Sequence, residues 1–387
     1  MESSCGSCSK TQHHSWKSGT LARGCQLCVK GEKLVLFITG LCGQKCFYCP
    51  VSEKKFGSDV VFANEWKIKN PDNPFELFEE ARLTNATGAG ITGGDPLIKV
   101  DRCCEYIKLL KKEFGKNFHI HLYTPLQIVN QERLQKLYDA GLDEIRFHPD
   151  LNDKTWWDRI FLGKKFGWDV GIEIPAIPGY EDKTKDLIDF IAGKVDFINL
   201  NELELSDTQA SHYQLNSAKF VAKNSLSYGV KGSQEMALKM VKYAHNKALS
   251  AHFCTAKLKD SVQVGQRLKR RAKNVALPNE NITSEGTIIR GVIYLKNTVP
   301  SFGYRKHLQE VSRQPVIEEL NKTMQELIKN QIFKETEIRI DEIKLRLITG
   351  EKNVQKAALQ LKKLNLVPVI VEEYPTSDSL EIDMQFV

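Results

Sequence analysis

Residues 33–49 read KLVLFITGLCGQKCFYC, and this stretch decides the architecture of the chain. Its first part, LVLFITG at 34–40, is a continuous apolar and β-branched run ended by a glycine, which is typical of a strand buried in a parallel sheet. Cys42, Cys46 and Cys49 follow in the loop behind that run. The stretch therefore predicts a parallel sheet with a thiol-based site at the carboxyl end of its first strand.

Five more apolar runs continue the pattern of the first. They are AGIT at 89–92, FHIHLYT at 118–124, DEIRFH at 143–148, DVGIEIPAI at 169–177 and VDFINLNEL at 195–203. Helical patterns lie between the runs, most clearly at 101–114 and 131–141, where apolar residues recur three and four positions apart. Six alternating strand and helix units predict an α/β fold with a parallel sheet, as a full or partial (β/α) barrel or as an open doubly wound sheet. A partial (β/α)6 barrel of the TIM type is favoured, because several predicted strands end in polar residues. Polar residues at strand ends would then converge on one mouth of the barrel: Thr39, Asp95, His148 and Asn201.

A different unit begins at residue 285. GTIIRGVIYL is strand-like, 316–330 is an amphipathic helix pattern, and EIRIDEIKLRLI, VQKAALQLKKLN and VPVIVEEY predict strand, helix and strand. The chain is therefore predicted to have three parts. These are a four-cysteine, zinc-ribbon-like metal-binding segment at 1–32, the barrel with an extension at 33–284, and a small α+β domain at 285–387.

Composition places the chain among ordinary globular proteins, with 41% hydrophobic and 27% charged residues. The first twenty residues are polar, and no run approaches the ~20 apolar residues that a membrane helix needs. We therefore expect a cytoplasmic protein without a membrane partner. The net charge of +7 is uneven, since the run KLKDSVQVGQRLKRRAK at 257–273 contains seven basic residues and one acid, Asp260.

The cysteines are concentrated at the start of the chain, where seven of the ten lie within the first 49 residues. Disulfides are not expected in a reducing cytoplasm, so metal binding is the leading explanation. Thiolates are the soft ligands of iron-sulfur clusters, and the C-x3-C-x2-C spacing of Cys42, Cys46 and Cys49 allows them to hold one cubane. Three ligands leave the fourth iron open to a small molecule. The alternative, buried or zinc-binding cysteines, is weaker because zinc sites usually supply four ligands.

This triplet, with the aromatic Tyr48 before its third cysteine, resembles the radical S-adenosylmethionine (SAM) superfamily. The resemblance implies a 4Fe-4S cluster that binds SAM and cleaves it reductively to a 5′-deoxyadenosyl radical, which abstracts hydrogen from a substrate. It also implies an external electron donor of the flavodoxin or ferredoxin type.

A second feature of that superfamily follows the second strand, where Gly93, Gly94, Asp95 and Pro96 resemble its Gly-Gly-Glu-Pro segment. The glycines would let the backbone approach the methionine moiety of SAM, and the carboxylate of Asp95 would accept a hydrogen bond from the SAM ammonium. Asp95 is one methylene shorter than the commoner Glu, which affects its reach.

A third resemblance joins 172–182, IEIPAIPGYED, to the fifth-strand region of pyruvate formate-lyase activating enzymes. Glu173, Arg146 and His148 are then candidates for contacts to the carboxylate and ribose of SAM, although each could equally be an ordinary polar residue at a strand end. The superfamily resemblance covers 33–205, and the whole chain looks like an archaeal-type group related to these activating enzymes.

A second cysteine set precedes the first strand. Cys5, Cys8, Cys25 and Cys28 form two C-x2-C pairs with the spacing of four-cysteine zinc sites. This pattern favours structural zinc, with a second iron-sulfur cluster as the alternative. His13 and His14 lie between the pairs and could substitute as ligands, although the favoured interpretation is that they are exposed loop residues.

The remaining cysteines divide into two groups. Cys103 and Cys104 lie on a helix and are expected in the core. Cys254 lies near the expected barrel mouth with His252, and is a candidate catalytic residue, as a radical partner, a methyl carrier or a cluster ligand. Simple burial is the alternative for Cys254.

The favoured substrate is RNA, including tRNA. Basic residues of the 257–273 run would contact its phosphates: Arg267, Lys269, Arg270, Arg271 and Lys273. One alternative is an enzyme that modifies protein or peptide, including the installation of a glycyl radical. Another is a non-catalytic metal-binding interaction module, which would bind metal without turning over SAM.

Overall fold

The computed structural model describes residues 8–206, 208, 215, 220–225, 227–301 and 303–387. It divides into two compact units, Met1–Arg267 and Leu268–Val387. The sequence places its boundaries elsewhere, after residues 32 and 284. Each unit has its own sheet and core.

Unit 1 is built on seven parallel strands. In spatial order they are β3 (Lys33–Phe37), β6 (Gly88–Thr92), β7 (His119–Pro125), β8 (Glu144–His148), β9 (Asp169–Ala176), β10 (Phe197–Glu202) and β13 (Ser250–Cys254). All six predicted strands are present, and the predicted α/β fold is confirmed. The seventh strand, β13, is a segment that the sequence pattern did not identify as a strand.

Short antiparallel strands flank this parallel sheet at both ends. β2 (Trp16–Ser18) pairs with β13 and with β1 (Ser9–Lys10), while β4 (Phe62–Ala63) pairs with β3 and with β5 (Trp66–Lys67). The sheet is therefore open, and its first and last parallel strands do not pair with each other.

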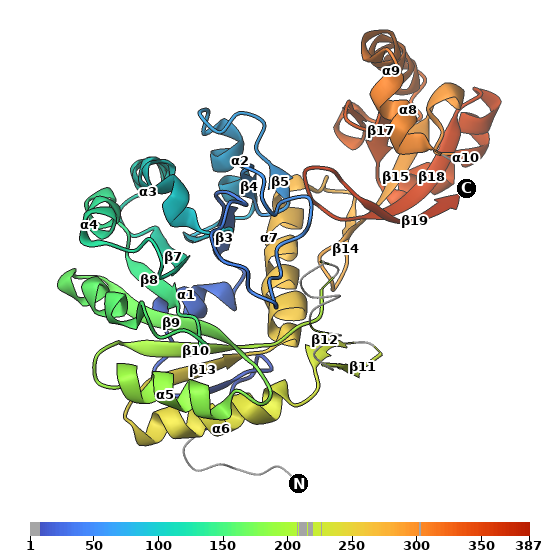
Figure 1. The fold of residues 1–387 in the computed structure, drawn as a ribbon. Coiled ribbons are helices and arrows are strands. Elements are labelled where there is room, and N and C mark those ends of the chain that lie inside the picture. The colour runs from blue at the N-terminus through green and yellow to red at the C-terminus, as the bar shows by residue number, and fades with distance from the viewer. Residues whose placement is uncertain (1–7, 207, 209–214, 216–219, 226, 302) are drawn as a thin grey trace. The chain divides into compact units, whose positions relative to one another are not determined.

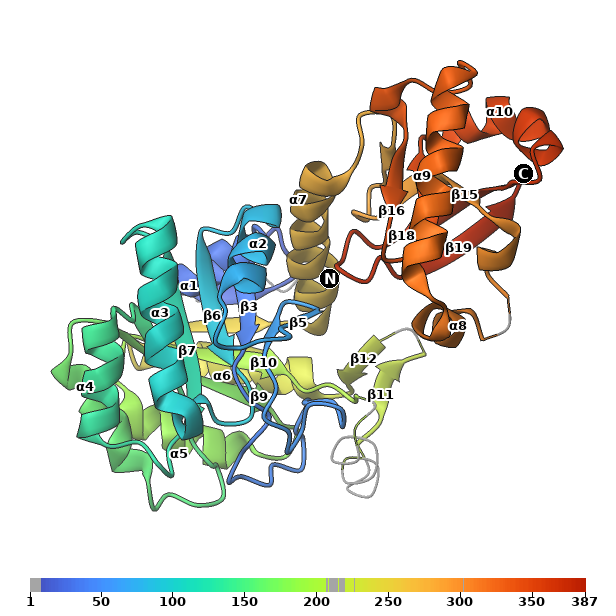
Figure 2. The same cartoon turned by 90° about the horizontal axis from the view of Figure 1, so that it is seen from above.

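Helices cover the outer face of the sheet. They are α2 (Phe75–Leu83), α3 (Val100–Phe114), α4 (Gln131–Ala140), α5 (Glu181–Ile191) and α6 (Ser233–Asn246). The strands form an arc with α3, α4, α5 and α6 outside it, whereas α1 (Arg23–Cys28) lies inside, against β3, β6 and β7 (Figure 1). Figure 2 shows the same unit from above.

Strand alternation separates the two faces of the sheet. Ile120 and Leu122 point into the apolar core under the helices, while His121 and Tyr123 line the inner cavity. The polar inner face is where a functional site can form. Beyond β10 the chain forms the hairpin β11 (Ala222–Asn224) and β12 (Ser227–Val230). After α6 and β13, a π-helical turn at Leu258–Val264 leads into α7 (Gly265–Val275).

Unit 2 is a separate antiparallel sheet with helices, as the predicted α+β pattern requires. Its strands are β14 (Asn281–Ile282), β15 (Ile288–Tyr294), β16 (Arg339–Asp341), β17 (Arg346–Thr349), β18 (Val367–Glu373) and β19 (Glu381–Phe386), and its helices are α8 (Tyr304–Glu310), α9 (Arg313–Lys329) and α10 (Glu351–Lys363). Leu320 of α9 and Leu361 of α10 are fully buried in its core. The predicted single strand EIRIDEIKLRLI is two strands, because Asp341 accepts hydrogen bonds from the N–H groups of Ile343 and Lys344 and so forms a turn.

Among the described residues, no helix has both the length and the hydrophobicity needed to cross a membrane.

Candidate active site

The three cysteines of the first motif lie in the loop behind β3. Cys42, Cys46 and Cys49 are half-buried, and all three line one cavity of about 660 Å³. A volume of this order suits a small-molecule cofactor. The Cys49 N–H donates to the carbonyl of Cys46 at 3.1 Å, which closes the second half of the triplet into a turn. The loop thus presents its thiols to a single space.

The Gly-Gly-Asp segment behind β6 lies directly against this loop. The N–H groups of Gly94 and Asp95 donate to the carbonyls of Thr39 and Leu41, both at 2.8 Å. A Cβ atom on Gly94 would lie 2.4 Å from the Leu41 carbonyl oxygen and 2.9 Å from the Cys42 Cβ. Glycine is required at position 94 because the backbone of this segment packs directly on the backbone of the cysteine loop. The sequence pattern indicated a different reason, the approach of the methionine moiety of SAM, and that role stays a prediction.

Asp95 is buried, with 3% of its surface exposed, and it does not line the cavity. Its Oδ1 caps the short 3-10 helix Pro96–Lys99 by accepting from the Leu97 N–H at 3.0 Å, and it also accepts from the Thr124 hydroxyl at 2.9 Å. Burial raises the pKa of the Asp95 carboxyl to about 6. The contact between Asp95 and the SAM ammonium stays a prediction.

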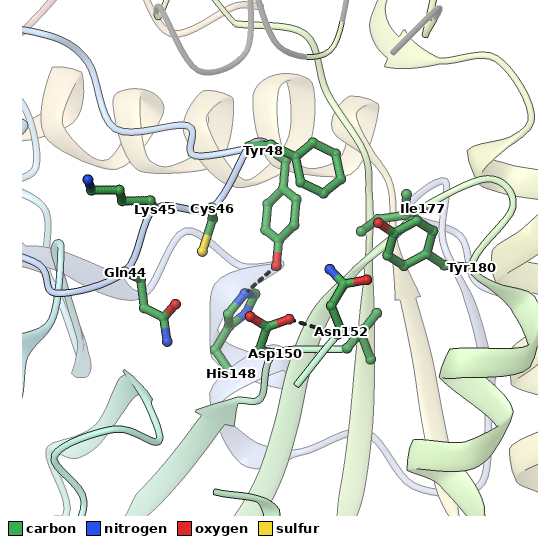
Figure 3. A pocket seen from close by; sticks show the side chains of 11 residues that line it. Gln44, Lys45, Cys46, Tyr48, His148, Asp150, Asn152, Ile177 and Tyr180 are labelled. Carbon is green, nitrogen blue, oxygen red and sulfur yellow. Dashed lines mark hydrogen bonds between the residues drawn. The ribbon is translucent and has the colours of Figure 1, made fainter. Parts of the chain in front are cut away.

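Tyr48 is held in place by His148, as Figure 3 shows. The Nδ1 of His148 lies 2.7 Å from the Glu173 carbonyl oxygen, which can only accept, so Nδ1 carries a proton. Burial lowers the pKa of His148 and keeps the ring neutral. Its Nε2 therefore accepts from the Tyr48 hydroxyl at 2.9 Å. Both side chains line the cavity, so this hydrogen bond fixes the aromatic ring beside the cysteine loop.

Arg146 and Glu173 form a buried ion pair, with Nη1 and Oε2 2.8 Å apart. Glu173 also accepts from the amides of Asn199 and Asn201, each at 3.0 Å. Although burial raises the pKa of the Glu173 carboxyl, Arg146 and these amides hold it below its ordinary value. Glu173 lines the cavity and Arg146 does not, because Glu144 also holds the guanidinium at 2.5 Å. Arg146 is therefore placed to support Glu173.

The cavity extends from the cysteine loop to the amino ends of the strands. There its wall includes Cys28, Lys33 and His121. Lys259 and Gln263, from the π-helical turn, complete another side, and Lys259 forms an ion pair with Glu204. Cys28 was predicted as a metal ligand, whereas the other four residues were not predicted to lie at the site: Lys33, His121, Lys259 and Gln263. The alternation in FHIHLYT was the available signal, since it places His121 and Tyr123 on one face.

The second cysteine set is described only in part, because Cys5 lies outside the described residues. Cys25 is 6% exposed, and its sulfur accepts from the Arg146 guanidinium at 3.4 Å and from the Asn199 amide at 3.3 Å. Within the described part of the chain, no three His, Cys, Asp or Glu side chains form a preassembled metal site, at the first triplet or here. The predicted zinc site, with His13 and His14 as substitutes, stays a prediction.

The other cysteines are buried. Cys103 donates to the Pro96 carbonyl at 3.3 Å, and Cys104 is 8% exposed, in agreement with the predicted core role. Cys254 is 9% exposed and lies beside Gln263, without lining the cavity itself. Burial raises the pKa of the Cys254 thiol. Its proposed catalytic role stays a prediction.

The basic run is less exposed than its sequence indicates. Arg267 is 8% exposed and forms an ion pair with Glu65 at 2.6 Å, and Arg271 is 5% exposed. Lys269 and Arg270 are half-buried, and Lys273 is exposed. Two of the five expected phosphate contacts are therefore buried in this structure.

These elements define a class of protein. A thiol triplet behind the first parallel strand, packed on a Gly-Gly-Asp segment and facing one cavity, is the arrangement of enzymes that bind SAM at an iron-sulfur cluster. The model of the Radical SAM superfamily matches residues 36–191. A protein named "Putative glycyl-radical enzyme activating enzyme", from Methanocaldococcus jannaschii, is 39% identical over 372 residues, which cover 94% of this chain and 92% of that protein. The chain belongs to the radical SAM superfamily.

More distant similarities were also found. "Probable GTP 3′,8-cyclase" from Methanococcus maripaludis is 29% identical over 148 residues, 37% of this chain and 46% of that protein. Among solved structures, methylornithine synthase has a TM-score of 0.38 and 13% identity over 59% of this chain and 74% of that chain. The radical SAM methyltransferase TsrM from Kitasatospora setae has a TM-score of 0.36 and 12% identity over 50% of this chain and 40% of that chain.

The superfamily implies a 4Fe-4S cluster and SAM, and the residues present fit both. Three soft thiol donors share one cavity wall, and no fourth cysteine lies in their loop. Gly93 and Gly94 bring the second motif to the same wall.

Proposed function

We propose that this radical SAM enzyme acts on a protein client, as a glycyl-radical enzyme activating enzyme does. The observation that carries the proposal is the single cavity that joins the cysteine triplet to Glu173 and continues to the amino ends of the strands. The similarity to the Methanocaldococcus jannaschii protein supports the choice of client, because it extends over 94% of this chain.

The cluster and SAM supply the reductive cleavage chemistry when they are bound. The protein positions these groups and excludes water. Cys42, Cys46 and Cys49 would hold the cluster, Tyr48 is oriented by His148, and Glu173 is kept ionised as an acceptor for a donor group of SAM. An external donor of the flavodoxin or ferredoxin type would deliver the electron. A reducing cytoplasm suits these thiols, and we place the enzyme there.

The rim of the cavity suits a protein segment. Pro50, Val51 and Phe56 line it, and Phe56 is 46% exposed. Exposed apolar side chains at a cavity rim favour contact with a polypeptide. RNA is the second candidate, and the burial of Arg267 and Arg271 weakens it.

The test compares both client classes in one extract. Reconstituted enzyme, SAM and a reductant are added anaerobically to an extract of cells that lack the enzyme, with Cys46→Ala as the control. We expect 5′-deoxyadenosine and a new protein-based radical in the electron paramagnetic resonance spectrum, both absent with the variant. A modified nucleoside in the RNA of the extract, with no protein radical, would contradict the choice of client.

We also propose that Cys5, Cys8, Cys25 and Cys28 bind a second metal, which is structural zinc or, as the alternative, a second iron-sulfur cluster.

A further inference from the structure

We propose that Lys259 and Glu204 form the subsite of the cavity that holds a backbone peptide group of the protein client. The two side chains form an ion pair and are 33% and 24% exposed. Both line the cavity that also contains Cys42, Cys46 and Cys49. This inference rests on the proposed function, because it assigns a contact that a polypeptide would make inside the cavity.

The subsite lies outside the part of the chain that matches the superfamily. The superfamily model covers residues 36–191, whereas Glu204 follows β10 and Lys259 belongs to the π-helical turn Leu258–Val264. Turns of this kind are rare and occur frequently at functional sites. The matched part supplies the cysteine triplet and the Gly-Gly-Asp segment. Because different functions are built on one fold through local additions, the added pair is where this enzyme can recognise its own substrate.

Two hydrogen bonds place this subsite beside the candidate cluster and SAM residues. The hydroxyl of Thr208, which follows Glu204 in the chain, donates to the Cys49 carbonyl at 3.1 Å. The amide of Asn201, which precedes Glu204, donates to the Glu173 carboxylate at 3.0 Å. The segment that contains Glu204 is therefore tied to the cysteine loop on one side and to Glu173 on the other.

The backbone that carries the two side chains is fixed within unit 1. Glu204 forms a β-bridge with Gly229 of β12, and the neighbouring Leu205 N–H donates to the Tyr228 carbonyl at 2.8 Å. Lys259 lies in the hydrogen-bonded π-helical turn, and its ion pair with Glu204 joins this turn to the end of β10. Side chains held in this way are preorganised for binding, so a client would meet them already in position.

The chemistry of the pair suits a neutral peptide group. Although burial lowers the pKa of the Lys259 ammonium, Glu204 raises this pKa above its ordinary value, so Lys259 stays a donor. Glu204 in turn neutralises the charge of Lys259, which makes the subsite a poor binder of phosphate. An ammonium has three N–H donors, and carboxylate oxygens can accept several hydrogen bonds. The pair can therefore donate to a peptide carbonyl while it accepts from a peptide N–H.

The test separates binding of the client from the cleavage of SAM. The double variant Lys259→Met, Glu204→Gln removes both charges together, so neither charge is left without its partner. The variant and the natural chain are reconstituted anaerobically, and two products are measured: 5′-deoxyadenosine formed without extract, and the protein radical formed in the extract described above. We expect unchanged 5′-deoxyadenosine and a protein radical about tenfold weaker, because the client loses hydrogen bonds to charged groups.

Lys257→Met is the matched control for this variant. Lys257 is exposed, directly precedes the same π-helical turn and does not line the cavity. We expect both products to match those of the natural chain. A SAM-responsive cluster spectrum in the double variant shows that unit 1 is folded.

The outcomes distinguish this inference from the proposed function. An undiminished protein radical in the double variant would overturn the subsite and leave the protein client in place. Loss of the 5′-deoxyadenosine formed without extract, or of the cluster spectrum, would assign the pair to the cluster or SAM site and would also overturn the inference. A modified nucleoside with no protein radical in the natural chain would refute the proposed function, and the peptide subsite with it.

Discussion

At the scale of one residue, the buried carboxyl of Asp95 links the stability of the fold to pH. Its carboxyl is buried beside Thr124, and burial raises its pKa from 3.8 to about 6. Above pH 6 the group is ionised in both the folded and unfolded states, so the folded state carries the full cost of burying the charge. Below pH 3.8 the group is neutral in both states and the cost disappears. The predicted contact with the SAM ammonium would give this buried charge a role in binding.

We therefore predict that Asp95→Asn is more stable than the natural chain at pH 7 and binds SAM more weakly. The amide keeps the Oδ1 acceptor for Leu97 and removes the buried charge. We expect a gain of about 1–3 kcal/mol in the free energy of unfolding at pH 7, which vanishes as the pH falls below about 4. Urea unfolding followed by tryptophan fluorescence measures the gain, and equilibrium dialysis measures SAM binding. Unchanged SAM affinity would exclude Asp95 from the binding site.

Individual side chains were only partly predictable from the sequence. His148 was selected as a strand-end polar residue, and it lines the cavity. Arg146, two residues earlier on the same face of β8, does not line the cavity, because Glu144 and Glu173 hold it in the interior. Alternation identifies the face of a strand, but the depth of a side chain depends on ion pairs with partners distant in sequence.

At the scale of elements, the contact between the cysteine loop and the Gly-Gly-Asp segment supports the cluster site. We predict that Gly94→Ala loses most of its cluster, because the added Cβ would overlap the Leu41 carbonyl and push against Cys42. Overpacking of this kind costs about 1–3 kcal/mol. Iron content after anaerobic reconstitution measures the loss.

Gly43→Ala is the matched control for this substitution. Gly43 lies in the same loop, and a Cβ there would meet no atom within 4 Å. We expect it to retain the iron content of the natural chain. Equal iron in both variants would show that the close packing of the two motifs does not matter for the cluster.

The parallel strands with strong apolar runs were predicted, and the edge elements were not. β3 and β7 have clear local patterns, whereas β13 reads SAHFC and β1 has only two residues. Such short segments become strands through the partners beside them, as β2 does by pairing with β13. The sequence pattern did not predict α1 as a helix, because its six residues show little periodicity and its cysteines indicated metal binding.

At the scale of the whole molecule, the chain consists of two compact units. Every residue that lines the cavity lies in unit 1. The division at Arg267 lies inside the continuous helix α7, and the domain boundary expected after residue 284 stays a prediction. A helical pattern does not reveal where along a helix the contacts change from one unit to another.

We predict that a chain ending at Val275, after α7, still binds a cluster and cleaves SAM. It should produce 5′-deoxyadenosine within a few-fold of the full-length rate, and it should no longer modify the client. Chromatography of the nucleoside product and the client assay described above measure the two activities. A truncated chain that holds no cluster would show that unit 2 is needed for the site itself.

The most direct test of the central claim is the electron paramagnetic resonance spectrum of the reduced, anaerobically reconstituted protein, recorded with and without SAM. Cys42, Cys46 and Cys49 should give a cluster signal that changes when SAM is added, because the open iron becomes ligated. The signal and its response should both be lost in Cys46→Ala. A cluster whose spectrum is unaffected by SAM, or a response that survives without Cys46, would contradict this account.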